Sequence, residues 1–196
     1  MPCGYEEATM LDSNLLIYSI LADHPASPVC QELIEASESL VASSITLIEL
    51  FFVTARIYGI EPALVLIKIN ELLASPLTII AVDADTVAAA LALCAEYKID
   101  TNDAVQVQMC LDLGIPALAT DDGRLIDLCK KLKIETKNPI TLELKQAMRI
   151  WEEANLPQKG LPRILHQIHG WIATHNHALA DDFRNVTRNL TRMPQQ

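Results

Sequence analysis

The segment Gly114-Ile115-Pro116-Ala117-Leu118-Ala119-Thr120-Asp121-Asp122 decides the fold. A Gly-x-Pro turn precedes a short apolar strand over 117–119, and polar and acidic residues follow it directly. Similar apolar stretches are expected to form strands at 8–11, 40–42, 77–82 and 134–136. Because these short strands alternate with helical segments, the sequence predicts an α/β fold with a central parallel sheet and helices on both faces.

The segments between the strands carry helical periodicity and end signals. Pro62 suits the first turn of a helix over 62–74, and Asp83 is placed to cap a helix over 84–97. Residues 105–109 allow two readings, because they alternate like a strand and also fit a helix. We predict a helix there, since Asp103 would cap it and Gly114 would end it. The other expected helices are 15–21, 28–39, 46–57 and 124–132.

The α/β alternation stops after about residue 139. The remaining sequence predicts one helix over 141–155 and one or two more over 162–190. We therefore divide the chain into an α/β domain, residues 1–140, and a helical C-terminal extension, residues 141–196.

Composition restricts the class of protein. The 196 residues are 51% hydrophobic, but no uncharged apolar run approaches the roughly 18–20 residues of a membrane span, and residues 1–10 do not resemble a secretory signal. The net charge of −10 argues against nucleic-acid binding by overall charge alone. Buried free thiols in the cytoplasm are the favoured interpretation of the cysteines, with disulfides or zinc as the alternatives. The cysteines are Cys3, Cys30, Cys94, Cys110 and Cys129.

Several acids stand where strands end or helices begin. Asp12 follows the first strand, Asp103 opens a helix, and Asp121 and Asp122 follow the strand over 117–119. In an open parallel sheet, sites collect beyond the carboxyl ends of the strands. Each acid also has a purely structural interpretation, as a helix cap for Asp12 or Asp103 and as part of a polar turn for the other two.

Glu49 shares a helical stripe with the apolar residues Ile45, Phe52 and Val53. A carboxylate on such a stripe loses hydration unless a cation meets it. Arg56, two turns further along, could be that cation, and a bound metal ion is the alternative. The residues alone leave both possibilities open.

A cluster of carboxylates resists shared ionisation, because each negative charge raises the pKa of the others. A divalent cation removes this conflict. Ligands that are all oxygen select Mg²⁺ or Mn²⁺ over zinc. Ions of this kind neutralise phosphate charge and orient an attacking water.

Four segments carry a resemblance to a known family. They are Leu11-Asp12-Ser13-Asn14-Leu15-Leu16-Ile17, Ser44-Ile45-Thr46-Leu47-Ile48-Glu49, Asp103-Ala104-Val105 and the segment 114–122. In order and spacing, from about residue 8 to 137, they resemble the motifs of PIN-domain ribonucleases, and of the VapC-like toxins of type II toxin–antitoxin systems in particular.

The resemblance assigns roles to the acids. It implies that residues 1–140 form a PIN-like nuclease domain whose catalytic, metal-binding quartet is Asp12, Glu49, Asp103 and Asp122. It also implies secondary metal ligands and polar supports. The secondary ligands are Asp121 and Asp100, and the supports are Asn14 and Thr120.

The function that the resemblance implies is a Mg²⁺- or Mn²⁺-dependent endoribonuclease that hydrolyses RNA phosphodiester bonds by attack of water. Such a protein would act as the toxin of a toxin–antitoxin pair, with an antitoxin protein as partner and a homodimer as its assembly. VapC toxins usually end near the last strand or one helix later, so residues 141–196 are additional. No residue of the sequence can be assigned to RNA binding.

Three alternatives remain open at this stage. The first is a PIN-fold RNA-processing nuclease that is not a toxin. The second is a catalytically inactive PIN-fold scaffold or RNA-binding module. The third is an unrelated α/β protein whose aspartates only cap helices.

Overall fold

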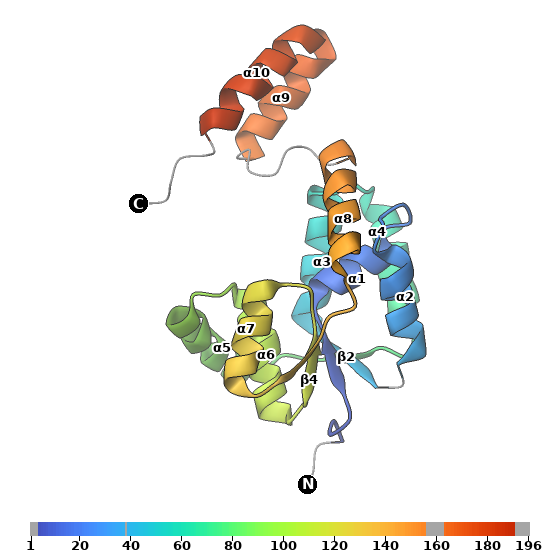
Figure 1. Ribbon diagram of the computed structural model, residues 1–196, viewed down its shortest axis with the longest axis vertical. Helices are drawn as coiled ribbons and strands as arrows, with labels where there is room; N and C mark the ends of the chain where they lie inside the picture. Colours follow the sequence, from blue (N-terminus) through green and yellow to red (C-terminus); the bar gives the residue numbers. More distant parts are fainter. Residues whose placement is uncertain (1–3, 38, 156–162, 191–196) are drawn as a thin grey trace. The chain divides into compact units, whose positions relative to one another are not determined.

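A computed structural model describes residues 4–37, 39–155 and 163–190 (Figure 1). The chain divides into two compact units, residues 1–149 and 150–196. The division falls inside helix α8 (Leu142–Asn155), which was predicted over 141–155. None of the helices in the described ranges combines the length and the apolar character needed to cross a membrane.

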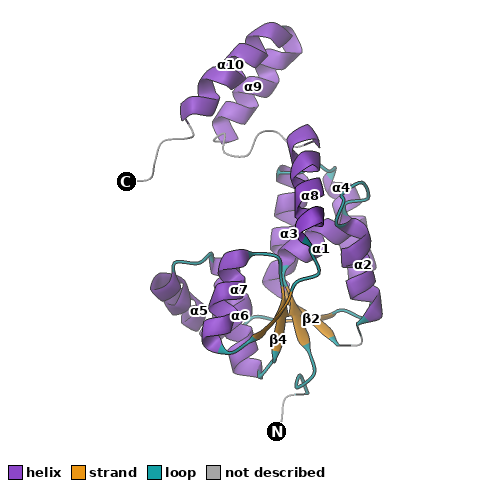
Figure 2. Ribbon diagram, viewed as in Figure 1, coloured by secondary structure: helices purple, strands orange, loops and turns teal. Residues whose placement is uncertain are grey.

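A parallel five-stranded sheet lies at the centre of the first unit (Figure 2). The order of the strands is β3-β2-β1-β4-β5, so β1 is central and the chain runs outward from it in both directions. The direction of winding changes between β1 and β4, which is where open α/β sheets form their crevice. The strands are β1 (Thr9–Leu11), β2 (Leu40–Ser43), β3 (Thr78–Ile80), β4 (Ala117–Ala119) and β5 (Glu135–Lys137).

Helices cover both faces of this sheet, which confirms the predicted α/β class. Side chains alternate between the two faces along each strand: Leu118 packs into one apolar cluster and Ala119 into the other. The cluster on one face is formed with α1 (Ser13–Ile20), α2 (Ser27–Ala36), α3 (Ser44–Arg56), α4 (Pro62–Leu73) and the beginning of α8. The cluster on the other face is formed with α5 (Ala84–Tyr97), α6 (Thr101–Leu113) and α7 (Gly123–Leu132).

Helix α6 confirms the helical interpretation of residues 105–109. Gly114 ends it in the left-handed conformation at φ 66°, as predicted. The prediction that Asp103 caps the helix is wrong, because Asp100 occupies the N-cap position and α6 begins at Thr101. Asp103 therefore lies inside the first turn, where its carboxylate is free of a capping role.

The described cysteines are free thiols: Cys30, Cys110 and Cys129 are buried and Cys94 is half-buried. Cys3 lies outside the described residues.

In the second unit, α9 (Arg163–His175) and α10 (His177–Leu190) pack against each other as a helical hairpin. Ala180 and Thr187 are buried in the part of α10 whose side chains are described, residues 177–187. The Thr187 hydroxyl donates to the backbone carbonyl of Phe183 at 2.7 Å, so its polar group is satisfied inside the helix.

Candidate active site

Asp12 lies directly after β1 and is only 1% exposed. It holds the N-cap position of α1, but its side chain makes no capping hydrogen bond. Its Oδ2 instead accepts a hydrogen bond from the Thr120 hydroxyl at 2.6 Å. Its Oδ1 accepts from Gln106 Nε2 at 3.2 Å and from the Ser13 hydroxyl at 3.2 Å. Side chains from distant segments therefore hold the carboxylate. A helix-capping carboxylate would instead accept hydrogen bonds from backbone N–H groups of its own helix.

Thr120 connects the ends of the two central strands. Its hydroxyl oxygen donates to Asp12 and also accepts from the backbone N–H of Asp122 at 3.0 Å. Asp122 in turn caps α7, since its Oδ1 accepts from the N–H groups of Arg124 at 2.6 Å and Leu125 at 3.0 Å. The sequence predicted Asp122 only as part of a polar turn, and the structure shows that it is the N-cap of α7. The cap fixes the orientation of this carboxylate beside Thr120.

Glu49 is presented by α3, which begins at Ser44 because the Ser43 side chain accepts from the N–H of Thr46 at 3.1 Å. Glu49 Oε2 is buried without a hydrogen-bond partner among the described residues. Arg56 is exposed and forms no ion pair with it, so the structural explanation of this glutamate is wrong. A buried carboxylate oxygen of this kind points to a partner outside the described residues, such as a bound ion or an ordered water.

The pKa of Asp103 shows which carboxylates lie close to it. Burial, the largest cause, and the charges of Asp12, Asp122, Asp100 and Glu49 together raise the pKa of Asp103 to about 7. Repulsion of this kind requires that each of the four other carboxylates lies near Asp103. The sequence placed them on four separate segments, and the structure brings them together.

Asp12 and Asp121 have pKa values above their usual range for the same main reason. Burial is the largest cause for both, and hydrogen bonds from Thr120 and Gln106 partly offset it for Asp12. Asp121 Oδ1 is a second buried oxygen without a described partner. The positive charge of Lys145 lowers the pKa of Asp121, and Lys145 Nζ also donates to its backbone carbonyl.

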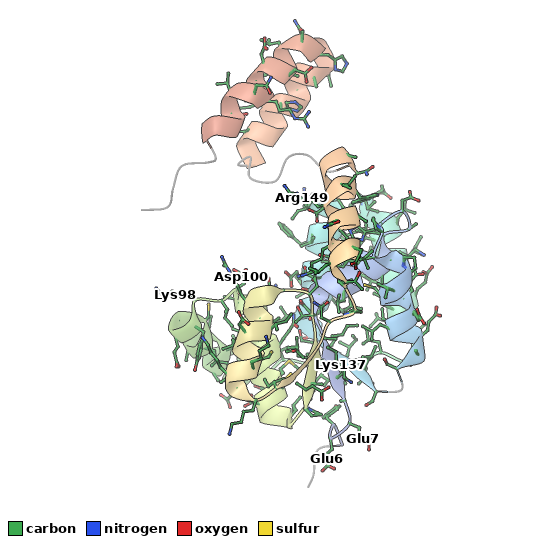
Figure 3. All side chains as sticks on the ribbon, viewed as in Figure 1. Glu6, Glu7, Lys98, Asp100, Lys137 and Arg149 are labelled. Carbon is green, nitrogen blue, oxygen red and sulfur yellow. The ribbon has the colours of Figure 1, made fainter. Side chains whose placement is uncertain are left out.

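A cavity of about 670 Å³ opens beside this acidic cluster. Asp100, Asp103 and Asp122 line it, together with the cations Lys98 and Arg124. Figure 3 shows Lys98 and Asp100 on the segment that joins α5 to α6.

Asn14, predicted as a support, is half-buried in the first turn of α1.

The sequence did not single out Gln106 or Lys145. Gln106 is fully buried and lies three residues after Asp103 on α6, so a polar residue one turn from a candidate acid was the available signal. Lys145 lies on α8, and no local sequence pattern indicates that this helix contacts the residues that follow β4.

The residues present fit a hard divalent cation in their chemistry. The possible ligands are carboxylates, and two buried oxygens, Glu49 Oε2 and Asp121 Oδ1, have no partner among the described residues. In their described positions, however, no three or more His, Cys, Asp or Glu side chains gather closely enough to hold an ion. Binding would therefore require the carboxylates to rotate toward a common point.

Comparisons with known proteins concern the fold of the first unit. VapC20 of Mycobacterium tuberculosis, described as a toxin that cleaves the sarcin–ricin loop, has a similar fold: the TM-score is 0.55 and the identity 15%, over 62% of this chain and 95% of that one. A toxin–antitoxin complex from Klebsiella pneumoniae matches with a TM-score of 0.49 and 20% identity, over 67% and 98%. No curated protein sequence matches. Residues 9–131 match the PIN domain, and the chain therefore belongs to the PIN-domain family.

Proposed function

We propose that this chain is a divalent-metal-dependent endoribonuclease that hydrolyses RNA phosphodiester bonds and acts in the cytoplasm as the toxin of a toxin–antitoxin pair. One observation carries the proposal: carboxylates from four segments converge at the carboxyl edge of the sheet, where a buried oxygen of Glu49 has no described partner. PIN-family membership supports a nuclease, and the fold shared with the RNA-cleaving toxin VapC20 makes RNA the first substrate to test.

Asp12, Glu49, Asp103 and Asp122 would hold Mg²⁺ or Mn²⁺. A bound ion would neutralise phosphate charge and provide an activated water. Asp121 and Asp100 would be secondary ligands, and Asn14 would be a polar support.

The chain's own contribution is orientation. Thr120 fixes Asp12 through its hydroxyl and Asp122 through its backbone N–H, so one side chain sets the relative positions of two acids. Gln106 holds the other oxygen of Asp12. These contacts keep the acids ordered at the end of β1 and β4, where a phosphodiester would have to approach them.

A cleavage assay on total RNA tests the proposal. Purified wild-type protein is incubated with Mg²⁺, with Mn²⁺ or with EDTA, and compared with Asp103→Asn. The matched control is Asp85→Asn, because Asp85 is an exposed aspartate in the first turn of α5. We expect cleavage by the wild type and the control with either ion, and a loss of at least about a hundredfold in Asp103→Asn and in EDTA.

Each outcome assigns the protein to one of the alternatives. Cleavage that is equal in Asp103→Asn would contradict the proposed site. RNA binding without cleavage would indicate an inactive scaffold. Cleavage without growth arrest on expression would indicate an RNA-processing nuclease.

An antitoxin and a second copy of the chain are the proposed protein partners. Large apolar side chains remain exposed on the adjacent helices α3 and α4, among them Phe52 at 54% and Leu64 at 55%. Exposed apolar surface of this kind usually marks a protein interface. Sedimentation of the purified chain alone measures the homodimer, and sedimentation with the product of any adjacent small gene measures the complex with an antitoxin. Phe52→Glu should weaken whichever of these two assemblies uses the exposed surface of α3 and α4.

A further inference from the structure

Basic side chains are concentrated on one side of the acidic cluster. Residues 1–140 contain eight Lys and Arg residues against twenty acids. Four of the eight line two cavities, of about 670 Å³ and about 410 Å³, that share lining residues and therefore adjoin. The four are Lys98, Arg124, Lys130 and Lys131.

Three of these cations have no carboxylate partner among the described residues. Lys98, Arg124 and Lys131 form no ion pair with any described residue. Asp127, which lines both cavities, faces Lys130 at 3.5 Å. In a chain with an excess of acids, cations that stay unpaired beside a cavity are available to an external anion.

The cations begin at the acidic cluster and lead away from it. Lys98 and Arg124 line the same cavity as Asp103 and Asp122, and the Arg124 backbone N–H is bonded to Asp122 Oδ1 at 2.6 Å. Lys131 lines only the second cavity. It lies seven residues after Arg124, on the same face of α7 and about 10 Å further along the helix. That separation lets the two cations bind different phosphates of one strand.

We infer that Lys98, Arg124 and Lys131 form a track that binds the backbone phosphates of single-stranded RNA and leads the strand to the acidic cluster. This inference rests on the proposed function, because it assigns the substrate path to the same site. The track is made of cations, and cations bind phosphates without distinguishing bases. The track also explains how a protein with a net charge of −10 can bind a polyanion such as RNA, because the positive charge is concentrated on the surface that the RNA would contact.

The inference is tested by binding in EDTA, which separates binding from cleavage. The probes are fluorescently labelled ten-nucleotide oligoU and oligoA, titrated at several salt concentrations. The test variant is Lys98→Gln/Arg124→Gln, and the matched control is Lys68→Gln/Arg56→Gln, which removes the same charges from α4 and α3. Glutamine removes the charge and keeps a polar side chain, and melting curves check that both variants are folded.

We expect the test variant to lose at least about tenfold in affinity at 100 mM salt, equally for both oligonucleotides, and the control to stay within about twofold. The slope of log K against log salt should become shallower by about 1.4, which corresponds to two phosphate contacts on a single strand. Lys131→Gln alone should lower the slope by about 0.7.

Equal affinities of the test and control variants would overturn the track, and so would an absence of oligonucleotide binding by the wild type. Cleavage by the wild type is measured in parallel with Mn²⁺. If the wild type cleaves RNA while the test variant binds normally, the track is wrong and the proposed function stands. If the variant loses binding but the wild type cleaves nothing, the track stands and the proposed function fails.

Discussion

Lys145 Nζ donates a hydrogen bond to the backbone carbonyl of Asp121 at 2.9 Å. The contact joins the first turn of α8 to the end of β4, and the charge of Lys145 lowers the pKa of Asp121 while burial raises it. Residue 145 lies beyond the predicted end of the α/β domain at residue 140, yet its side chain acts on the acidic cluster. The beginning of α8 is therefore part of the site.

Replacing Lys145 with Met removes this charge and keeps most of the side-chain volume. The pKa of Asp121 should rise, because the cation that lowers it is gone. We expect the acid limb of the pH profile of Mn²⁺-dependent cleavage to move to higher pH. Lys145→Arg, which keeps the charge, should restore the profile, and identical profiles for Lys145→Met and the wild type would rule out the electrostatic role.

Replacing Thr120 with Val removes the hydroxyl that serves both Asp12 and Asp122. Asp12 would lose its shortest hydrogen bond in a buried position, so we expect a loss of about 1–3 kcal/mol of unfolding free energy. Cleavage should fall about tenfold or more, because the two acids are no longer fixed to each other. Denaturant unfolding and kcat measure the two effects.

Thr120→Ser is the control for this change, since it keeps the hydroxyl. It should retain most of the activity that Thr120→Val loses. Equal losses in both variants would mean that the methyl packing of Thr120, and not its hydroxyl, supports the site.

The pKa of Asp103 predicts how the stability of the metal-free protein depends on pH. Its value rises from the usual 3.8 to about 7 on folding, so between these values the folded chain keeps a proton that the unfolded chain has lost. Stability therefore falls as pH rises from about 4 to 7. Because Asp103 is partly exposed, screening reduces the contribution of this group to about 1–2 kcal/mol.

Asp103→Asn should remove much of this pH dependence and raise the melting temperature at pH 7.5 in EDTA, while it abolishes cleavage. Circular dichroism melts at pH 5 and pH 7.5 measure the effect, with Asp85→Asn as the control. A variant that is less stable than the wild type at pH 7.5 would contradict the repulsion that surrounds Asp103.

Binding of Mn²⁺ should release a proton below pH 7, because the ion needs the ionised form of Asp103. We expect the apparent affinity for Mn²⁺ to rise up to about tenfold per pH unit between pH 5.5 and 6.5 and to level off above about pH 7.5. Calorimetry in buffers of different ionisation enthalpy counts the proton. An affinity that does not change over this range would show that Asp103 is not a ligand.

Much of the fold followed from sequence because local signals agreed with the sheet. Asp83 caps α5 through the N–H of Thr86 at 2.8 Å, and Gly114 ends α6, both as predicted. Strand β5 begins one residue later than predicted, at Glu135. Lys133 adopts a left-handed conformation and the N–H of Ile134 bonds to Cys129, so the end of α7 uses the residue that the apolar pattern assigned to the strand.

The grouping of the acids was also predictable, because ordered motifs placed Asp12, Asp103 and Asp122 near the end of a strand or the start of a helix and Glu49 on a helical stripe. Their partners were not. Gln106 and Lys145 reach the site through tertiary packing of α6 and α8. The position of Gln106 one turn after Asp103 was the only local signal for either contact, and it does not identify Asp12 as the partner. The two structural explanations, a helix cap by Asp12 and an ion pair of Glu49 with Arg56, were also wrong. Helix periodicity shows which side chains share a face, but it does not show which residues of other segments they contact.

The position of β1 has a consequence for the order in which the protein is made. Asp12 leaves the ribosome early, but β4, which pairs with β1 and carries Thr120 and Asp122 at its end, follows more than 100 residues later. Until then one side of β1 has no neighbouring strand, and an exposed strand edge of this kind invites aggregation. A chain that ends before residue 117 would therefore lack Thr120 and Asp122 and would tend to aggregate, so the acidic cluster can be completed only after synthesis has passed Asp122.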